Sequence, residues 1–379
     1  MPAPAAATRS DARRRPLPPL LTPAQRLRRV LWLAIGICLL PIVISYAATM
    51  TSSSNSSFTI QTIEWVRDHG GAGIATTLES WYYSMNAPST GGPALHKLAL
   101  RSRTTSEIHP RDIAPLISPA LPGEGVWAAT ETWSGRNSPV QITQFRSDPL
   151  YPQMVAGVAW IDPRRTNIAL YAGQLEPSVT MPNRGPMEVP PALRSRLLAT
   201  FNSGFKLEDS HGGWADWGHT YAPLQNGMAT FVHYGDGRVN IVDWANGPHL
   251  LPGMDYARQN LPLIVEGGRP NPNLSDGPQW GATLGNAIRV WRSGIGIDAR
   301  GDLIYAAADN QTVGSLAAIL IRAGAIRAME LDINSYWDTF ISYAHPDAGG
   351  PSSLLPGMVR PVTRYLSPDD RDFFAVYLR

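Results

Sequence analysis

An apolar run near the N-terminus restricts where the rest of this chain can fold. Residues 30–48 carry no charged side chain and are long enough to cross the hydrocarbon core of a bilayer. Arginines crowd the segment before the run, where Asp11 is the only acid, and the next charged residue is Glu64. Because basic residues accumulate on the cytoplasmic side of a membrane helix, we predict a single-pass anchor at residues 30–48. Residues 1–29 would then form a cytoplasmic tail, and the C-terminal part would lie outside the cytoplasm at the cell membrane.

A cleaved signal peptide is the alternative to an anchor. Ser45 and Ala47 form a passable small-residue cleavage site, but the apolar run is longer than the usual core of a signal peptide. The length therefore favours an uncleaved anchor, which makes the lipid bilayer a partner of the chain through residues 30–48.

The remaining chain has the composition of a large folded domain without disulfide bonds. The single cysteine, Cys38, lies inside the apolar run, so the part outside the membrane must be held together by its core. Acidic side chains slightly outnumber basic ones after residue 50, and no basic patch indicates a nucleic-acid partner. The strong preference for arginine over lysine is typical of a bacterium with a GC-rich genome.

Shifts in composition divide the chain after the anchor into three parts. Residues 49–57 are small and polar, which predicts a flexible linker. Residues 58–150 contain an expected amphipathic helix at 58–69, a second helix at 77–83 and stretches rich in Pro and Ser. We assign them as an accessory N-terminal region of the ectodomain, without a functional interpretation. Residues 151–379 form the main domain with a C-terminal extension.

Short apolar segments bounded by turn residues dominate the main domain and predict strands. Residues 228–234 and 239–244 flank a Gly-Asp-Gly turn and form the clearest hairpin. A second hairpin is expected at 295–307, followed by a helix at 313–323 whose apolar side chains share one face. This pattern predicts an α+β (mixed α/β) fold: a mixed, largely hairpin-built sheet covered by helices and preceded by one transmembrane helix. Further strands are expected at 155–161, 168–172, 261–266 and 326–331.

Three polar segments of the main domain adjoin expected strands. In chain order they begin at Asn202 (N-S-G-F-K), at Arg292 (R-S-G-I-G-I-D) and at Ala328 (A-M-E-L-D-I-N-S). With the hairpin and helix between the last two, they resemble the phosphodiester glycosidase family over about residues 155–343. In that family the blocks read N-G-G-F-F, R-t-a-i-G-i-d and A-l-n-L-D-G-G-G-S. The order and spacing of the blocks carry the resemblance, because no single block is specific.

The resemblance implies a hydrolase that releases a sugar from a sugar-1-phosphodiester, and we expect no cofactor and assign no metal ligand. Glycoside cleavage passes through an oxocarbenium-like state that a carboxylate stabilises or attacks, and Asp332 is the best candidate for that carboxylate. Glu330, two residues earlier, would face the same side of a strand, and the planar guanidinium of Arg292 would bind phosphate. The expected catalytic residues are Asp332, Glu330 and Asn202, and the expected substrate-binding residues are Arg292, Ser203, Gly204, Asn334, Ser335 and Trp337.

Each central assignment has a structural alternative. Asp332 would serve equally well as a turn cap after its strand, and Asn202 would close an Asx turn. Arg292 would form a surface ion pair. If these residues act together, Asn202, Arg292 and Asp332 should line one pocket with Glu330 nearby.

The third segment departs from the family pattern. Ile333 and Asn334, followed by Ser335, replace glycines that would let a backbone approach a ligand closely. Bulkier side chains imply a reshaped pocket, a different substrate or lost activity. A hydrolase acting on envelope glycans and a catalytically inactive glycan-binding or scaffold protein of the envelope therefore both stay open. A third hypothesis, a metal-dependent hydrolase, rests on His211, Asp216 and His219, which lack a recognised ligand spacing.

Overall fold

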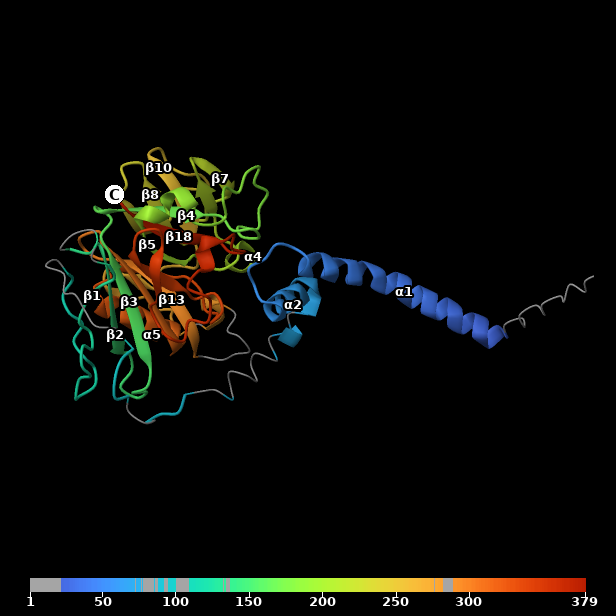
Figure 1. Ribbon diagram of the computed structural model, residues 1–379, viewed down its shortest axis with the longest axis horizontal. Helices are drawn as coiled ribbons and strands as arrows, with labels where there is room; N and C mark the ends of the chain where they lie inside the picture. The colour runs from blue at the N-terminus through green and yellow to red at the C-terminus, as the bar shows by residue number, and fades with distance from the viewer. Residues whose placement is uncertain are drawn as a thin grey trace, which may run out of the picture. The chain divides into compact units, whose positions relative to one another are not determined.

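The computed structural model of the chain describes most residues from 22 onward. These residues fall into two units, one that ends at Ser52 and one that runs from Ser53 to Arg379 (Figure 1). The helix expected at 77–83 lies almost entirely outside the described residues. The described residues are 22–71, 73–75, 77, 85, 88–91, 95–99, 109–131, 133, 137–275, 277–281 and 289–379.

The first unit contains one long helix, α1 (Pro23–Met50). Thr22 caps its first turn: the Thr22 hydroxyl accepts from the amide of Gln25, whose side chain accepts from the Thr22 amide. α1 is long and apolar enough to cross a membrane, and none of its residues is buried. A signal sequence near an N-terminus meets the same criteria. The expected apolar helix is therefore confirmed, and its topology stays a prediction.

The second unit is built from strands joined by short helices (Figure 1). The helices are α2 (Phe58–Val66), η1 (Arg67–Gly71), η2 (Pro191–Arg196), α4 (Leu207–Ser210), η3 (Gly277–Trp280), α5 (Val313–Arg322) and η5 (Arg364–Leu366). The strands are β1 (Ala128–Ala129), β2 (Val140–Arg146), β3 (Val155–Ile161), β4 (Thr166–Tyr171), β5 (Leu197–Asn202), β6 (Trp214–Asp216), β7 (His219–Ala222), β8 (Ala229–Tyr234), β9 (Val239–Asp243), β10 (Met254–Gln259), β11 (Val265–Glu266), β12 (Arg269–Pro270), β13 (Val290–Ile297), β14 (Leu303–Gln311), β15 (Arg327–Glu330), β16 (Phe340–His345), β17 (Gly349–Ser353) and β18 (Phe373–Leu378).

These strands form three sheets. Their orders are β1-β2-β3-β14-β13-β15-β11-β12, β7-β6-β10-β8-β9 and β17-β16-β5-β18-β4. The expected hairpins are present as β8–β9 and β13–β14. Every ladder between the described strands is antiparallel, so the expectation of a mixed sheet is wrong. The connections are hairpins and long excursions between sheets, and neither requires parallel neighbours.

Helix α5 covers one face of the eight-stranded sheet, beside β13 and β14. Thr312 caps the helix in a reciprocal box with Ser315. The apolar face of α5 reaches Gly294 of β13, where an added Cβ would lie 3.2 Å from Leu316 and 3.1 Å from Leu320. Glycine therefore permits close packing, and the helix predicted from its apolar periodicity is confirmed.

The opposite face of β13 and β15 contributes to a core that it shares with the five-stranded sheets. Alternation along these strands sends Ile295 and Met329 into the same cluster as Phe201 of β5, Phe231 of β8 and Phe374 of β18. Each of the five is almost fully buried, and burial of one such side chain stabilises a fold by about 1.5–3 kcal/mol. This core fixes the ends of β5, β15 and β18, where the candidate site lies.

The region assigned as accessory contributes strands to the eight-stranded sheet. β2 lies within residues 58–150 and pairs with β3 along its full length. A buried ion pair between Arg146 and Glu124, 2.7 Å apart, fastens the irregular segment before β2. The boundary assigned at residue 151 therefore falls between two neighbouring strands of one sheet.

Residues 53–57 are hydrogen-bonded to the rest of the second unit, although the sequence predicted a flexible linker. Two serines of this segment donate to Asp370 Oδ2 at 2.5 Å, and Asn55 Nδ2 donates to Asp369 Oδ2 at 2.9 Å. A serine-rich segment is mobile when nothing nearby accepts its hydrogen bonds, and here two aspartates do so. Helix α2 begins directly afterwards at Phe58, so the position of its first turn is fixed.

Candidate functional site

Asp332 lies where the chain leaves β15. Its backbone is held by β13: Ser293 N donates to the Asp332 carbonyl at 2.9 Å, and Asp332 N donates to the Ser293 hydroxyl at 3.1 Å. The Asp332 side chain turns forward, so that Oδ1 accepts from the amides of Ile333 and Asn334 at 2.8 and 3.0 Å. Asp332 therefore caps the turn after its strand, as the structural alternative to a catalytic role predicted. Its other oxygen, Oδ2, does not take part in the cap and can bind further partners.

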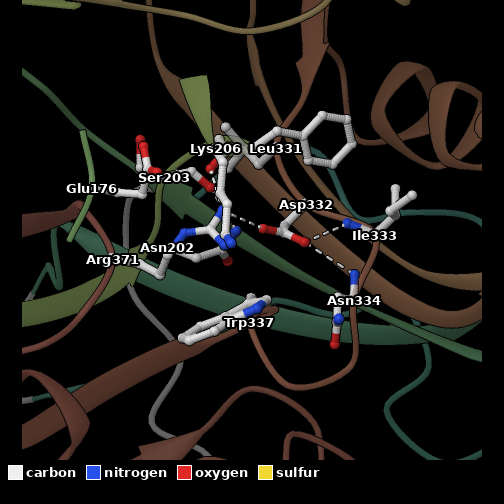
Figure 2. Close-up of polar contacts among 12 residues, drawn as sticks. Glu176, Asn202, Ser203, Lys206, Leu331, Asp332, Ile333, Asn334, Trp337 and Arg371 are labelled. Atoms are coloured by element: carbon white, nitrogen blue, oxygen red, sulfur yellow. Dashed lines mark hydrogen bonds and ion pairs between the residues drawn. The ribbon is translucent and has the colours of Figure 1, made fainter. Parts of the chain in front are cut away.

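The partner of Asp332 Oδ2 is Arg371, from the segment before β18. Arg371 Nη2 lies 3.4 Å from this oxygen and 3.3 Å from the Gly204 carbonyl, and the guanidinium stacks 5.0 Å above the Trp337 ring (Figure 2). Burial raises the pKa of Asp332 to about 6, although Arg371 and the two amides oppose the rise. Asp332 is therefore mostly ionised at neutral pH and becomes protonated in mild acid.

A second cation, Lys206, lies beside Arg371 (Figure 2). It follows β5, and its Nζ is 2.5 Å from Glu64 and 3.5 Å from Asp68, both from the helical segment that starts at Phe58. Burial alone would lower the pKa of Lys206, but the charge of Glu64 raises it overall. Burial alone would raise the pKa of Glu64, but Lys206 and Arg371 lower it overall. Lys206, beside Arg371, thus already holds carboxylates of the chain itself.

Asn202 is fully engaged by protein groups. Its Nδ2 donates to the Ser203 carbonyl at 2.9 Å and to the Ser293 hydroxyl at 3.0 Å. Its Oδ1 accepts from the Tyr305 hydroxyl at 2.9 Å and from the Thr339 amide at 3.0 Å. Ser293 in turn holds the backbone of Asp332, so Asn202 helps to fix the position of Asp332 through Ser293.

Arg292 and Glu330 pair with each other on the side of the sheet that α5 covers. The β13–β15 register sets Gly294 opposite Glu330, so alternation places Arg292 and Glu330 on one face. Arg292 Nη1 pairs with Glu330, and its Nε donates to the Gln311 carbonyl at 3.0 Å. Both side chains are almost fully buried, and burial raises the pKa of Glu330 although Arg292 opposes the rise. The structure therefore brings Asn202 to the Asp332 turn but directs Arg292 to Glu330.

Asp338 is a third acid near Asp332, and the sequence analysis missed it. The residue is fully buried, and burial together with the charge of Asp332 holds the pKa of its carboxyl well above the usual range, while the Ser293 hydroxyl partly opposes this. Burial therefore favours the neutral form of Asp338. Nothing in the local sequence marks it, because only the turn after β15 brings it next to Ser293.

The other predicted contacts lie close to Asp332 but differ in exposure. The Ser203 hydroxyl is buried and has no hydrogen-bond partner within the described part of the chain. Gly204 allows close approach of Asn260, which would lie 3.1 Å from an added Cβ. Asn334 and Ser335 are partly exposed in the turn, so they form the accessible edge of this cluster.

Trp337 is buried among guanidinium groups and is no open platform for a sugar ring. Only 5% of its surface is exposed. Arg371, Arg364 and Arg360 lie 5.0, 5.2 and 5.6 Å from its ring centre. Cation–π contacts of this kind hold Arg371 in position over Asp332.

Comparison with known families finds a match for the part of the chain that ends at Asp332. Residues 211–332 match the family model described as phosphodiester glycosidase. The chain carries a phosphodiester glycosidase domain. No curated protein sequence matches the chain.

Solved structures similar to the phosphodiester glycosidase domain include two with low identity. One is the catalytic domain of zebrafish N-acetylglucosamine-1-phosphodiester alpha-N-acetylglucosaminidase, auto-inhibited by pro-peptide. It is 15% identical with a TM-score of 0.41, and the match covers 67% of this chain and 87% of that chain. The other is a hypothetical protein from Synechocystis, 12% identical with a TM-score of 0.38, where the match covers 65% of this chain and 63% of that chain.

The matched range of the phosphodiester glycosidase domain ends at Asp332, but both cations of the site lie outside it. Lys206 precedes the range and Arg371 follows it. Lys206 had a signal in the sequence, since a lysine replaces the last phenylalanine of the family's N-G-G-F-F block. Arg371 had none, because only the placement of β18 beside β5 brings it to the site.

The loop histidines of the phosphodiester glycosidase domain do not join this cluster. His219 and Asp216 belong to the β6–β7 hairpin, where His219 packs edge-on to Tyr221 with ring centres 4.6 Å apart. Burial raises the pKa of Asp216 to about 7. Within the described residues, no three His, Cys, Asp or Glu side chains are grouped to hold a metal ion.

Proposed function

We propose that the chain is a membrane-anchored, extracytoplasmic hydrolase that cleaves a sugar from a sugar-1-phosphodiester in cell-envelope glycans. The observation that carries the proposal is the contact of Arg371, with Lys206 beside it, with an ionised carboxylate, Asp332, which ends the range that matches the phosphodiester glycosidase family. A carboxylate can stabilise or attack the anomeric carbon, and paired cations can bind the phosphate.

The proposed reaction breaks the bond between the anomeric carbon and the phosphate oxygen. Water adds its hydroxyl to the carbon and gives up one proton, and the phosphate leaves as a monoester with the bonding electron pair. A phosphate ester is already a stabilised anion, so it needs less help from a general acid than an alkoxide does. Asp332 would stabilise or attack the oxocarbenium-like centre, while Arg371 and Lys206 hold the phosphate.

This proposal moves the phosphate-binding role away from Arg292. The guanidinium of Arg292 is buried against Glu330, whereas Arg371 contacts Asp332 directly. Glu64 supports the new assignment, because its carboxylate already sits 2.5 Å from Lys206, as a phosphate oxygen would. A bound substrate would compete with Glu64 for that lysine.

The activity is tested with the full-length chain in detergent micelles. We expect it to release free sugar from a methyl phosphodiester of N-acetylglucosamine 1-phosphate and to act poorly on methyl glycosides. Lys206→Ala should raise KM about tenfold or more, because one charge-assisted contact to the phosphate is lost. Inorganic phosphate should compete with substrate much less in Lys206→Ala than in the wild type, which a purely structural lysine would not explain.

A catalytically inactive glycan-binding or scaffold protein of the envelope is the alternative. Ile333 and Asn334 favour this alternative, because their side chains stand where the family has glycines, which let a backbone approach a ligand closely. A wild-type chain that binds envelope glycan yet releases no sugar from a broad panel of phosphodiesters would contradict the hydrolase and leave this alternative.

The proposed location is tested by a reporter fused after Arg379. The arginines before residues 30–48 predict that the fused reporter is active only outside the cytoplasm. Reporter activity in the cytoplasm would contradict the assignment. Mass spectrometry of the mature N-terminus separately distinguishes an anchor from a cleaved signal.

A further inference from the structure

A cavity of about 560 Å³ opens at the ends of β13 and β15 that lie away from Asp332. It is lined by the turn after β3, the β8–β9 turn and the β13–β14 turn, together with Arg327 and Arg379. Ile297 pairs with Arg327 at the cavity, whereas Ser293 on the same strand holds Asp332. The strand between Ser293 and Ile297 spans about 13 Å, so the cavity is separate from the candidate active site.

Five arginines of the described chain line this cavity, together with two acids, Asp236 and Asp298. Three of them, Arg164, Arg238 and Arg300, form ion pairs with nearby aspartates. The other two, Arg327 and Arg379, have no ion-pair partner among the residues that the structure describes. An arginine stays protonated in proteins, so both keep a positive charge, and the two acids of the lining, Asp236 and Asp298, are paired with other arginines.

Neutral oxygen atoms hold these two arginines in place. Arg327 Nη2 donates to Asn240 Oδ1 at 2.7 Å. Arg379 donates to the carbonyls of Thr166 and Gly237 at 2.8 and 3.0 Å, and a Cβ on Gly237 would lie only 2.1 Å from Arg379 Nη2. The glycine therefore makes room for the guanidinium, and both cations are positioned by the fold.

Arg327 also has an unused hydrogen-bond donor. Its Nε is buried and donates to no atom of the described chain. Buried donors without an acceptor are rare and unfavourable in folded proteins. An anionic acceptor on a ligand in the cavity would accept a hydrogen bond from Arg327 Nε and would also neutralise the charge of the guanidinium.

We propose that this cavity is a binding site for an oxyanion carried by a sugar-sized ligand, such as the phosphate of a sugar phosphate. Guanidinium groups match the oxygens of phosphate and carboxylate in geometry and charge. The volume lies in the usual range for sites of small molecules. Arg327 belongs to β15 and Arg379 follows β18, so they can bind separate oxygens of one anion. The site does not depend on the hydrolase proposed above.

Hydrogen–deuterium exchange on the full-length chain in detergent micelles at low salt tests this site. Glucose 1-phosphate, glucuronate and inorganic phosphate each serve as probe, and neutral glucose serves as the blank. Slower exchange is expected in the turns at 235–238 and 299–301 with the anions and not with glucose. The glucuronate and inorganic phosphate arms show whether the site prefers phosphate and whether it needs the sugar. Arg327→Gln should weaken the apparent affinity about tenfold or more, because a charge-assisted hydrogen bond is lost.

Arg238→Gln is the matched control. Arg238 lines the same cavity, but its side chain is 74% exposed and already paired with Asp236, so affinity should change less than about twofold. If Arg327→Gln does not fold, as judged by circular dichroism, Arg379→Gln replaces it. Protection by glucose equal to that by the anions, protection confined to residues 332–337, or unchanged affinity in the arginine variant would each overturn the proposal.

Discussion

Asp332→Asn should lower turnover of a sugar-1-phosphodiester by at least about a hundredfold while leaving substrate binding largely intact. The proposed role of Asp332 is to meet positive charge that develops only in the transition state, and loss of such an interaction lowers kcat more than it changes KM. The fold should tolerate the change, because burial raises the pKa of this carboxyl and so already disfavours its charged form. An Asn oxygen can still accept from the amides of Ile333 and Asn334.

The pH dependence of the wild type gives a second readout of the same group. Asp332 must be ionised to act, and its pKa is raised to about 6, so kcat should fall about tenfold per pH unit below that value. The acid limb should be absent from any residual activity of Asp332→Asn. Steady-state kinetics between about pH 4.5 and about pH 8 would measure both.

Asp338→Asn is the matched control for this pair of experiments. Asp338 is as deeply buried as Asp332, but burial and the charge of Asp332 raise the pKa of its carboxyl and so favour the neutral form, which an uncharged amide imitates. This variant should retain most of the wild-type turnover. If Asp338→Asn were inactive and Asp332→Asn active, the catalytic assignment would be reversed.

Asp369→Ala should destabilise the domain by about 3–5 kcal/mol, the cost typical of removing one partner from a buried ion pair. Asp369 is fully buried and lies 2.8 Å from Arg364 and 3.2 Å from Arg360. It also accepts from Asn55 at 2.9 Å and from the Arg371 amide at 3.0 Å. Burial alone would raise the pKa of Asp369, but the two guanidinium groups lower it overall, so the native state uses its charged form. Without it, two buried cations lose their shared carboxylate.

Urea unfolding of the full-length chain in micelles, followed by tryptophan fluorescence, measures this loss. Asp236→Ala is the control, because the ion pair between Asp236 and Arg238 is exposed on a turn and contributes little. Equal unfolding midpoints for the wild type and Asp369→Ala would contradict the role given to this carboxylate.

Local patterns predicted the elements of this fold better than their assembly. The β8–β9 and β13–β14 hairpins and helix α5 follow from turn residues and apolar periodicity within short segments. The orientation of strands in the sheets was not predicted, because β3 pairs with β14 and β5 with β18 over long sequence separations. No local signal specifies such partners.

The candidate site shows the same difference between residues marked by local patterns and residues placed by long-range packing. Asp332 and Asn202 were found because each is a polar residue at or just after the end of an apolar strand. The expectation that Glu330 and Asp332 share a face used strand alternation, but β15 ends at Glu330, and Ser293 of β13 bonds the backbone of both Leu331 and Asp332, so the regular alternation stops there. Arg371 escaped notice because its contact with Asp332 depends entirely on tertiary packing.

The position of β18 has a consequence for the order of folding. β18 pairs with β4 on one side and with β5 on the other, so an interior position of its sheet is filled by the last of the described strands. A ribosome delivers β4 and β5 long before this strand, and until then their inner edges have no hydrogen-bond partners. Such pairing between distant segments gives a high contact order, which slows folding and prolongs the exposure of unpaired strand edges. The core that supports Asp332 therefore closes only after β18 has been synthesised.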